Sequence, residues 1–173
     1  MGYAFNPTGK GAVMTRYVLA CAFVLYGCTA NAENPIVVGT WNLLSTTQED
    51  VETKAVIDNR GAVRGSIQYS LGGHVVVFLS EANQTLPAGP VYTDAERAAA
   101  HKSIVAAYSG TYKVEGNKVT HHIEAAWLPH WVGTDVTRYI AIAGNKLTIK
   151  TSPQVFTQTG RLTITTLNFE KVE

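Results

Sequence analysis

Two-residue turns of glycine and asparagine divide much of the chain into short segments of alternating polarity. Gly116-Asn117 separates two such segments, Gly144-Asn145 separates the next two, and Gly72-Gly73 plays the same part earlier in the chain. Turns of this length join antiparallel neighbours, because glycine and asparagine adopt the positive φ angles that tight hairpins require. The sequence therefore predicts an antiparallel sheet built from successive hairpins.

Eight or nine strands follow from this pattern. In each of them, apolar and β-branched residues either alternate with polar ones or form a short continuous run. An open sheet of this size would leave edges exposed, so we expect an all-β fold in which the strands form an antiparallel up-and-down barrel. The predicted strands are 36–46, 63–70, 74–80, 111–115, 118–127, 132–143, 146–151 and 161–172.

One segment departs from the strand pattern. Thr93 and Glu96 have the spacing of a helix capping box, and an alanine-rich stretch follows them. Gly110 lies beyond that stretch, where it suits the end of a helix. We expect one short inserted helix over about residues 94–107.

The N-terminus has the parts of a secretory signal peptide. Arg16 precedes the apolar run 17–26, and small residues follow it as far as Ala30-Asn31-Ala32. The run is shorter than the roughly 20 apolar residues that a membrane span requires. The predicted organisation is a signal peptide over 1–32 and one domain over 33–173, exported to the periplasm or secreted.

An alternative processing route uses a cysteine of the same segment. Leu25-Tyr26-Gly27-Cys28 resembles the lipobox of bacterial lipoproteins, in which Cys28 would carry the lipid anchor. Cleavage after Ala32 would instead remove both cysteines of the chain. The remaining domain would then have neither a disulfide nor a catalytic thiol, and its stability would depend on its core.

The charge balance argues against some classes of partner. The chain has a formal net charge of +1, and the part after residue 32 holds 12 basic and 13 acidic residues. Binding to nucleic acid or to anionic lipid requires a basic face, which this balance does not provide. We therefore expect no nucleic-acid partner and no membrane span.

The residues from 119 to 134 hold the densest set of chemically active side chains. On a strand, His122 and Glu124 lie on one face, about 7 Å apart, which suits an acid–base pair. An exposed strand face is the alternative. His121 points the other way, either as a buried hydrogen-bonded residue or as a contact to a ligand.

Further candidates flank this segment. Arg138 alternates with apolar residues, and on an inward face its guanidinium would need a partner such as Glu124, backbone carbonyls or a ligand carboxylate. On an outward face it would be solvated. Trp127 and Trp131 lie on either side of Pro129, where they could cover a cavity or simply belong to the core.

Metal and cofactor sites are not expected. His130 or His74 could approach the other histidines only through folding, and no third ligand stands at a spacing diagnostic of zinc. The sequence also has neither a glycine-rich phosphate loop nor a nucleophile-elbow motif. We expect no metal and no cofactor.

Several motifs together resemble the bacterial lipocalin-like domain family. Gly39-Thr40-Trp41 is similar to the G-x-W motif of lipocalins, and the likeness extends over about residues 38–171. Members often carry asparagine where this chain has His130. The other matching segments are Tyr69-Ser70-x-x-Gly73-His74, 108–114, and 119–134 together with Arg138.

This resemblance implies a lipocalin-type barrel in which Trp41 is a structural plug packed against a basic residue. Arg161 is the first candidate for that partner, and Arg138 is the alternative. The leading functional hypothesis is binding of a small apolar or amphipathic molecule within the barrel. The candidate ligand-binding residues are His121, Trp127, Trp131, Arg138, Tyr69 and Tyr112.

Two other functions remain open. One is an enzyme on the same scaffold, an isomerase, cyclase or hydrolase that uses His122 and Glu124 for proton transfer. The other is a structural or interaction role for a barrel with a filled interior. The polarity of the inward residues distinguishes these functions.

Overall fold

The computed structural model describes residues 35–59, 63–85, 87–156 and 160–172. The predicted signal peptide, the cleavage site after Ala32 and the alternative anchor Cys28 lie outside the described residues. The described part contains ten strands, one α-helix and two short 3-10 turns. The strands are β1 (Gly39–Asp50), β2 (Val56–Asn59), β3 (Val63–Tyr69), β4 (His74–Glu81), β5 (Ile104–Glu115), β6 (Lys118–Ala126), β7 (Asp135–Ala143), β8 (Lys146–Thr151), β9 (Gln154–Phe156) and β10 (Arg161–Lys171).

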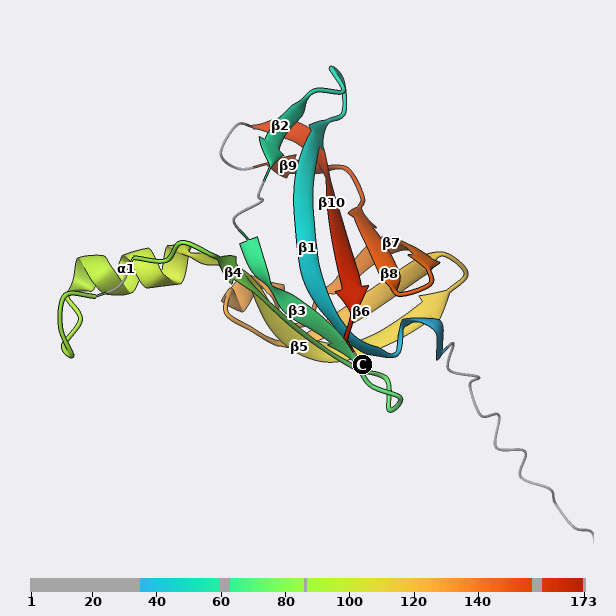
Figure 1. Ribbon diagram of the computed structural model, residues 1–173, viewed down its shortest axis with the longest axis horizontal. Coiled ribbons are helices and arrows are strands. Elements are labelled where there is room, and N and C mark those ends of the chain that lie inside the picture. Colours follow the sequence, from blue (N-terminus) through green and yellow to red (C-terminus); the bar gives the residue numbers. More distant parts are fainter. Residues whose placement is uncertain (1–34, 60–62, 86, 157–159, 173) are drawn as a thin grey trace, which may run out of the picture. The chain divides into compact units, whose positions relative to one another are not determined.

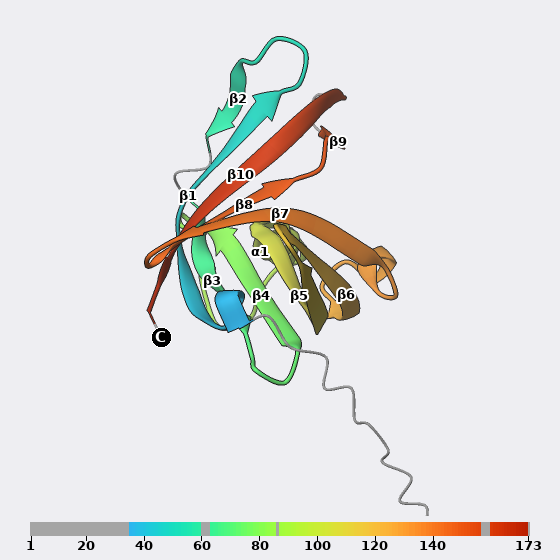
Figure 2. The same ribbon diagram turned by 90° about the vertical axis from the view of Figure 1, so that its right-hand side faces the viewer.

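The long strands close into a barrel. They follow the order β1-β3-β4-β5-β6-β7-β8-β10, and β10 pairs back onto β1 through a register that runs from Trp41 opposite Lys171 to Asp50 opposite Thr163. Every pairing is antiparallel. Figures 1 and 2 show these eight strands side by side, with the short β2 and β9 flanking β1 and β10. The prediction of an all-β, antiparallel, up-and-down barrel is confirmed.

One end of the barrel is packed tightly around Trp41. The 3-10 turn η1 (Pro35–Val37) precedes β1, and the indole Nε1 of Trp41 donates a hydrogen bond of 2.7 Å to the carbonyl of Val37. Trp41, Val75 and Phe169 are almost completely buried there. Trp41 is buried, as predicted, and its role as a structural plug stays a prediction.

The basic partner of Trp41 is Lys171. Its Nζ lies 5.5 Å from the centre of the Trp41 ring, within the range of a cation–π contact. The prediction of Arg161 or Arg138 as this partner was wrong. Arg161 starts β10 and pairs with Asp50 at 3.0 Å, whereas Lys171 ends β10 directly opposite Trp41.

The inserted helix is shorter than predicted. Helix α1 (Asp94–Lys102) begins with the predicted capping box of Thr93 and Glu96, and Ser103 caps its C-terminus. The prediction that it continues to about residue 107 was wrong, because β5 starts at Ile104. Pairing with β4 places Ala106 and Ala107 opposite Leu79 and Phe78, so the tertiary context overrides the helix propensity of alanine.

Two other boundaries differ from the prediction. Residues 36 and 37 belong to η1 instead of the first strand, and the strand predicted to start at residue 132 starts at Asp135. The turn η2 (Pro129–Trp131) precedes that strand. Proline fixes its own φ angle and lacks an N–H for a sheet ladder, which favours a turn here.

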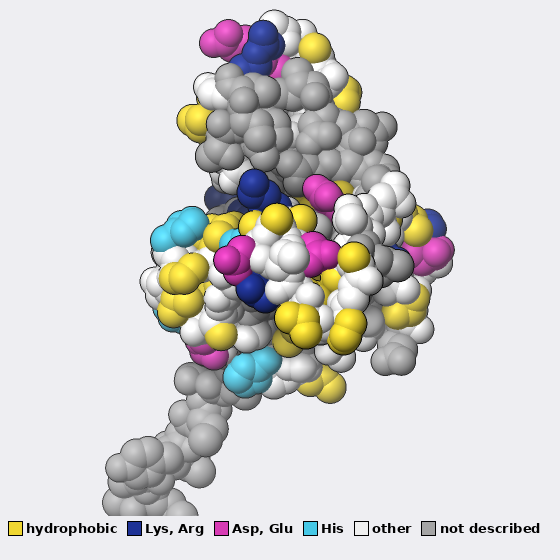
Figure 3. Space-filling view, turned by 90° about the vertical axis from the view of Figure 1, so that its left-hand side faces the viewer, with side chains coloured by type: hydrophobic (Ala, Val, Ile, Leu, Met, Phe, Trp, Pro, Cys, Tyr) yellow, Lys and Arg dark blue, Asp and Glu magenta, His cyan; other side chains and the backbone are white. Residues whose placement is uncertain are grey.

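Helix α1 projects away from the barrel on the connection between β4 and β5 (Figure 1). None of its residues is buried. Figure 3 views the molecule from the side of this helix and shows hydrophobic side chains scattered among acidic, basic and histidine ones. Among the described residues, no helix has both the length and the apolar character that crossing a membrane requires.

Candidate functional site

Strand register determines which candidate side chains point into the barrel. Val119, His121 and Ile123 alternate as buried residues along β6, so this face of β6 is the inner one. Arg138 on β7 pairs directly with Val119 and therefore points inward as well. Inward placement, one of the two alternatives for Arg138, is the one that the structure has.

His121 lies at the centre of a buried polar group. Its Nε2 is 3.0 Å from the hydroxyl of Tyr69 on β3, and its Nδ1 is 2.8 Å from the hydroxyl of Tyr108 on β5. His121 and Tyr69 are each 1% exposed, and Tyr108 is partly buried. The inner faces of β3, β5 and β6 thus build one hydrogen-bonded Tyr–His–Tyr chain.

Burial determines the protonation states of the three side chains in the Tyr–His–Tyr chain. Desolvation, with a smaller effect of the nearby Arg138 charge, lowers the pKa of His121 to about 3. Burial also raises the pKa of Tyr108 to about 12 and the pKa of Tyr69 well above its usual range. At neutral pH the imidazole is therefore neutral and both phenols keep their protons.

Arg138 supplies a positive charge beside the Tyr–His–Tyr chain, and together these four residues form the polar cluster of the barrel interior. Burial lowers its pKa, while the neighbouring Tyr108 and Tyr69 act in the opposite direction. Its Nη1 donates one hydrogen bond of 3.2 Å to the carbonyl of Thr137. Among the described residues, no carboxylate forms an ion pair with Arg138. Glu124, proposed as a partner, is exposed on the outer face of β6.

Aromatic rings extend the cluster toward η2. The ring of Trp131 meets Tyr108 edge-on at 6.0 Å, and Trp127 meets Trp131 edge-on at 6.5 Å. The ring of His101, at the end of α1, lies 4.6 Å from Trp127. The indole Nε1 of Trp127 is buried and has no hydrogen-bond partner among the described residues. The predicted bend with two tryptophans is thus joined to Tyr108.

Tyr112 has a different position from the other candidates. It packs edge-on against Tyr69 at 4.9 Å, and its hydroxyl donates to the carbonyl of Ser70 at 2.8 Å. It therefore supports Tyr69 and the β3–β4 hairpin. Hydrogen bonds and ring contacts, partly through Tyr108, connect the predicted ligand-binding residues Tyr69, Tyr112, His121, Trp127 and Trp131. Arg138 is linked to them through its charge, which acts on His121.

The predicted acid–base pair lies on the outer surface. His122 and Glu124 share one face, as their spacing indicates, but both side chains are exposed. His122 is hydrogen-bonded through Nδ1 to Asp135 at 2.7 Å instead of to Glu124. The strand register places Asp135 directly opposite His122. The structure thus separates the pair His122 and Glu124 from the cluster around His121.

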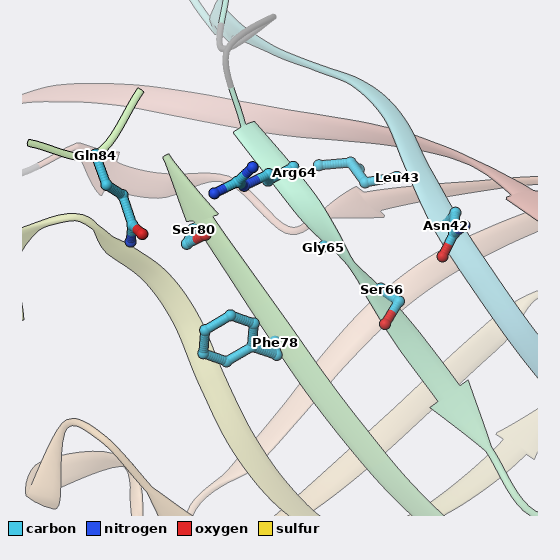
Figure 4. Close-up of a pocket in the computed structure, with 8 residues that line it drawn as sticks. All are labelled: Asn42, Leu43, Arg64, Gly65, Ser66, Phe78, Ser80 and Gln84. Atoms are coloured by element: carbon cyan, nitrogen blue, oxygen red, sulfur yellow. The ribbon is translucent and has the colours of Figure 1, made fainter. Parts of the chain in front are cut away.

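A groove of about 480 Å³ lies beside β3 and β4, away from the polar cluster. Ser66 pairs with Phe78 and Arg64 with Ser80, so these four side chains share the outer face of the two strands (Figure 4). The other residues that line it are Asn42, Leu43, Gly65 and Gln84.

Sequence reasoning missed Tyr108 and Asp135. Tyr108 lies just beyond the predicted helix and before the strand predicted to start at residue 111, although its spacing of four from Tyr112 places both on one face of a strand. Asp135 pairs with His122 only through the register of β6 and β7, which the sequence does not specify. Among the described residues, no cluster of three or more histidine, cysteine, aspartate or glutamate side chains could hold a metal ion.

A closed eight-stranded antiparallel barrel, with a buried tryptophan at the start of its first strand and a polar cluster inside, defines a lipocalin-type protein. The family model described as a lipocalin-like domain matches residues 38–172. The chain therefore belongs to the lipocalin-like domain family. No curated protein matches the sequence.

Proposed function

We propose that the protein binds one small apolar or amphipathic molecule inside its barrel. The observation that carries this proposal is that several inward side chains keep contact with solvent. Tyr108, Arg138 and Leu167 point into the barrel but are only partly buried, whereas Trp41 and its neighbours are sealed. A barrel of eight strands is wide enough either to be filled by side chains or to hold one small ligand, and partly buried inward side chains favour the second.

The lining supports a molecule with one polar and one apolar end. The polar cluster of Tyr108, His121 and Arg138 faces the same interior as apolar side chains such as Leu167 and Val105. Binding pockets for small molecules combine mostly apolar walls with a few polar groups that fix orientation. An amphipathic ligand fits this combination.

The alternative function is catalysis at the outer pair of His122 and Glu124. The contact of His122 with Asp135 is the observation that favours it, since a carboxylate orients an imidazole for proton transfer. Both residues of this contact are more than half exposed. The inner His121 favours binding instead, because both of its ring nitrogens are already hydrogen-bonded.

Native mass spectrometry of the protein purified from its own host tests the binding function. We expect a bound small molecule that is released on denaturation. A matched pair of variants locates it. Leu167→Trp fills the interior and should abolish the adduct. Thr166→Trp places the same ring on the outer face, opposite the exposed Lys150, and should retain it.

A protein without any adduct that also fails to bind apolar probes in solution would contradict the binding function. Loss of the adduct in Thr166→Trp but not in Leu167→Trp would place the ligand outside the barrel. If His122→Ala abolished a turnover measured on the released compound, the catalytic alternative would replace binding alone.

A further inference from the structure

Around His121, the polar groups that lack partners among the described residues are hydrogen-bond donors. The buried Oε1 of Gln48, on β1, is an acceptor without a described partner, but it belongs to the pairing of β1 with β10. Arg138 carries five N–H groups and never accepts a hydrogen bond. Within the described part of the chain, its one hydrogen bond is to the carbonyl of Thr137. Several guanidinium N–H groups therefore remain available in a partly buried position, where an unpaired charge is costly.

The Tyr–His–Tyr chain leaves one more donor. A neutral imidazole has one N–H and one acceptor nitrogen. One of Tyr69 and Tyr108 therefore donates its proton to His121, and the other accepts the N–H of His121. The accepting tyrosine keeps its own O–H proton, and neither hydroxyl has another partner among the described residues. Whichever tautomer forms, one phenol proton beside Arg138 is free.

Trp127 adds a third donor. Its Nε1 is buried and has no partner in the part of the chain that the structure describes, and an indole nitrogen can only donate. Trp127 reaches Tyr108 through the ring of Trp131. Buried polar groups are normally hydrogen-bonded, so an unpaired donor in this position points to an acceptor supplied by a ligand.

We propose that the ligand is an amphipathic carboxylate whose oxygens bind Arg138 and the free phenol proton, while its apolar part occupies the barrel. This inference rests on the proposed binding function and adds the chemical class of the ligand. A carboxylate only accepts hydrogen bonds, offers two oxygens to a guanidinium, and neutralises its charge. A hydroxyl would leave the charge of Arg138 uncompensated, and a protonated amine would add a second positive charge beside it.

Two matched pairs of probes test the inference by isothermal titration calorimetry. One pair is dodecanoate and 1-dodecanol, and the other is 2-naphthoate and 2-naphthalenemethanol. Within at least one pair we expect the carboxylate to bind about tenfold or more tightly than the alcohol, because only the carboxylate forms charge-assisted hydrogen bonds with Arg138.

Variants of two arginines test whether Arg138 causes the preference for the carboxylate over the alcohol. Arg138→Gln should remove the preference for the carboxylate, and Arg138→Lys should retain part of it. Arg64→Gln is the control, because Arg64 is exposed on the outer face of β3, and it should leave the preference unchanged. Thermal melts establish that each variant is folded.

The outcomes separate this inference from the proposed function. Equal binding of carboxylate and alcohol by the unmodified protein would overturn the inference and leave small-molecule binding intact. A preference that survives in folded Arg138→Gln would also overturn it. If no probe of either pair binds, both the inference and the proposed function fail.

Discussion

Both ring nitrogens of His121 form hydrogen bonds within the protein, so this residue supports the fold in addition to lining the candidate site. Its folded pKa of about 3 lies far below the value of about 6.5 for an unfolded chain. Between these values the unfolded state binds the proton and the folded state does not. Stability is therefore fully present above about pH 6.5 and decreases as the pH falls toward 3.

We expect the free energy of unfolding to fall by about 2 kcal/mol from pH 7 to pH 5 because of His121 alone. Urea unfolding at the two pH values measures this change. His121→Gln keeps hydrogen-bonding capacity without a titratable group and should reduce the difference. His122→Gln is the control. A pH dependence that persists unchanged in His121→Gln would show that other groups cause it.

Trp41 is the second residue on which the barrel depends. Replacement by alanine removes a buried indole, its hydrogen bond to Val37 and its contact with Lys171. We expect Trp41→Ala to lower the free energy of unfolding by about 3–5 kcal/mol, as for other large buried aromatics. Chemical denaturation measures the loss. Trp41→Phe should cost less, and a loss below about 1 kcal/mol for Trp41→Ala would contradict the plug function.

At the scale of elements, β5 and β6 must approach closely to build the site. The register shifts between Ser109 and Gly110, and an added Cβ at Gly110 would lie 1.9 Å from the carbonyl oxygen of His122. Only glycine fits this position without moving β6. The close approach brings Tyr108 and Tyr112 onto the face that His121 occupies.

We expect Gly110→Ala to destabilise the protein by more than about 2 kcal/mol, because the clash is with backbone and cannot be relieved by a side-chain rotation. Gly89→Ala is the matched control, since nothing lies within 4 Å of its added Cβ, and we expect a change within about 0.5 kcal/mol. Thermal melts compare the two. Equal melting temperatures would mean that β6 shifts freely at this point.

The sequence predicts the elements well where local chemistry decides them. The capping box of Thr93 and the glycine–asparagine turns depend only on neighbouring residues, and all are present. The end of α1 could not be predicted, because pairing with β4 draws the alanines into β5. The same holds for the Tyr–His–Tyr chain, whose members come from three strands and meet only through the barrel's register.

At the scale of the whole molecule, the number of hairpin-linked strands and the family resemblance predict the barrel, and pairing of β1 with β10 closes it. The resemblance indicates where a basic partner of Trp41 is needed, but not which residue it is. Lys171 and Arg161 both belong to β10, and only the register places Lys171 opposite Trp41. The first candidate, Arg161, has the right strand and the wrong position along it, and the alternative, Arg138, lies on β7.

The sequence of the first 32 residues predicts the cellular location of the protein. We propose that the protein is exported and that its mature form begins at Glu33, because Ala30-Asn31-Ala32 follows an apolar run of signal-peptide length. N-terminal sequencing of protein from its own host should give Glu33 as the first residue. Ala32→Asp should block this cleavage, because the site requires a small residue, and the precursor should accumulate. Leu44→Asp, on the exposed surface of the barrel, is the control for a general effect of the added charge. An acylated Cys28 at the N-terminus would contradict the prediction, and membrane fractionation would then find the protein anchored through that lipid.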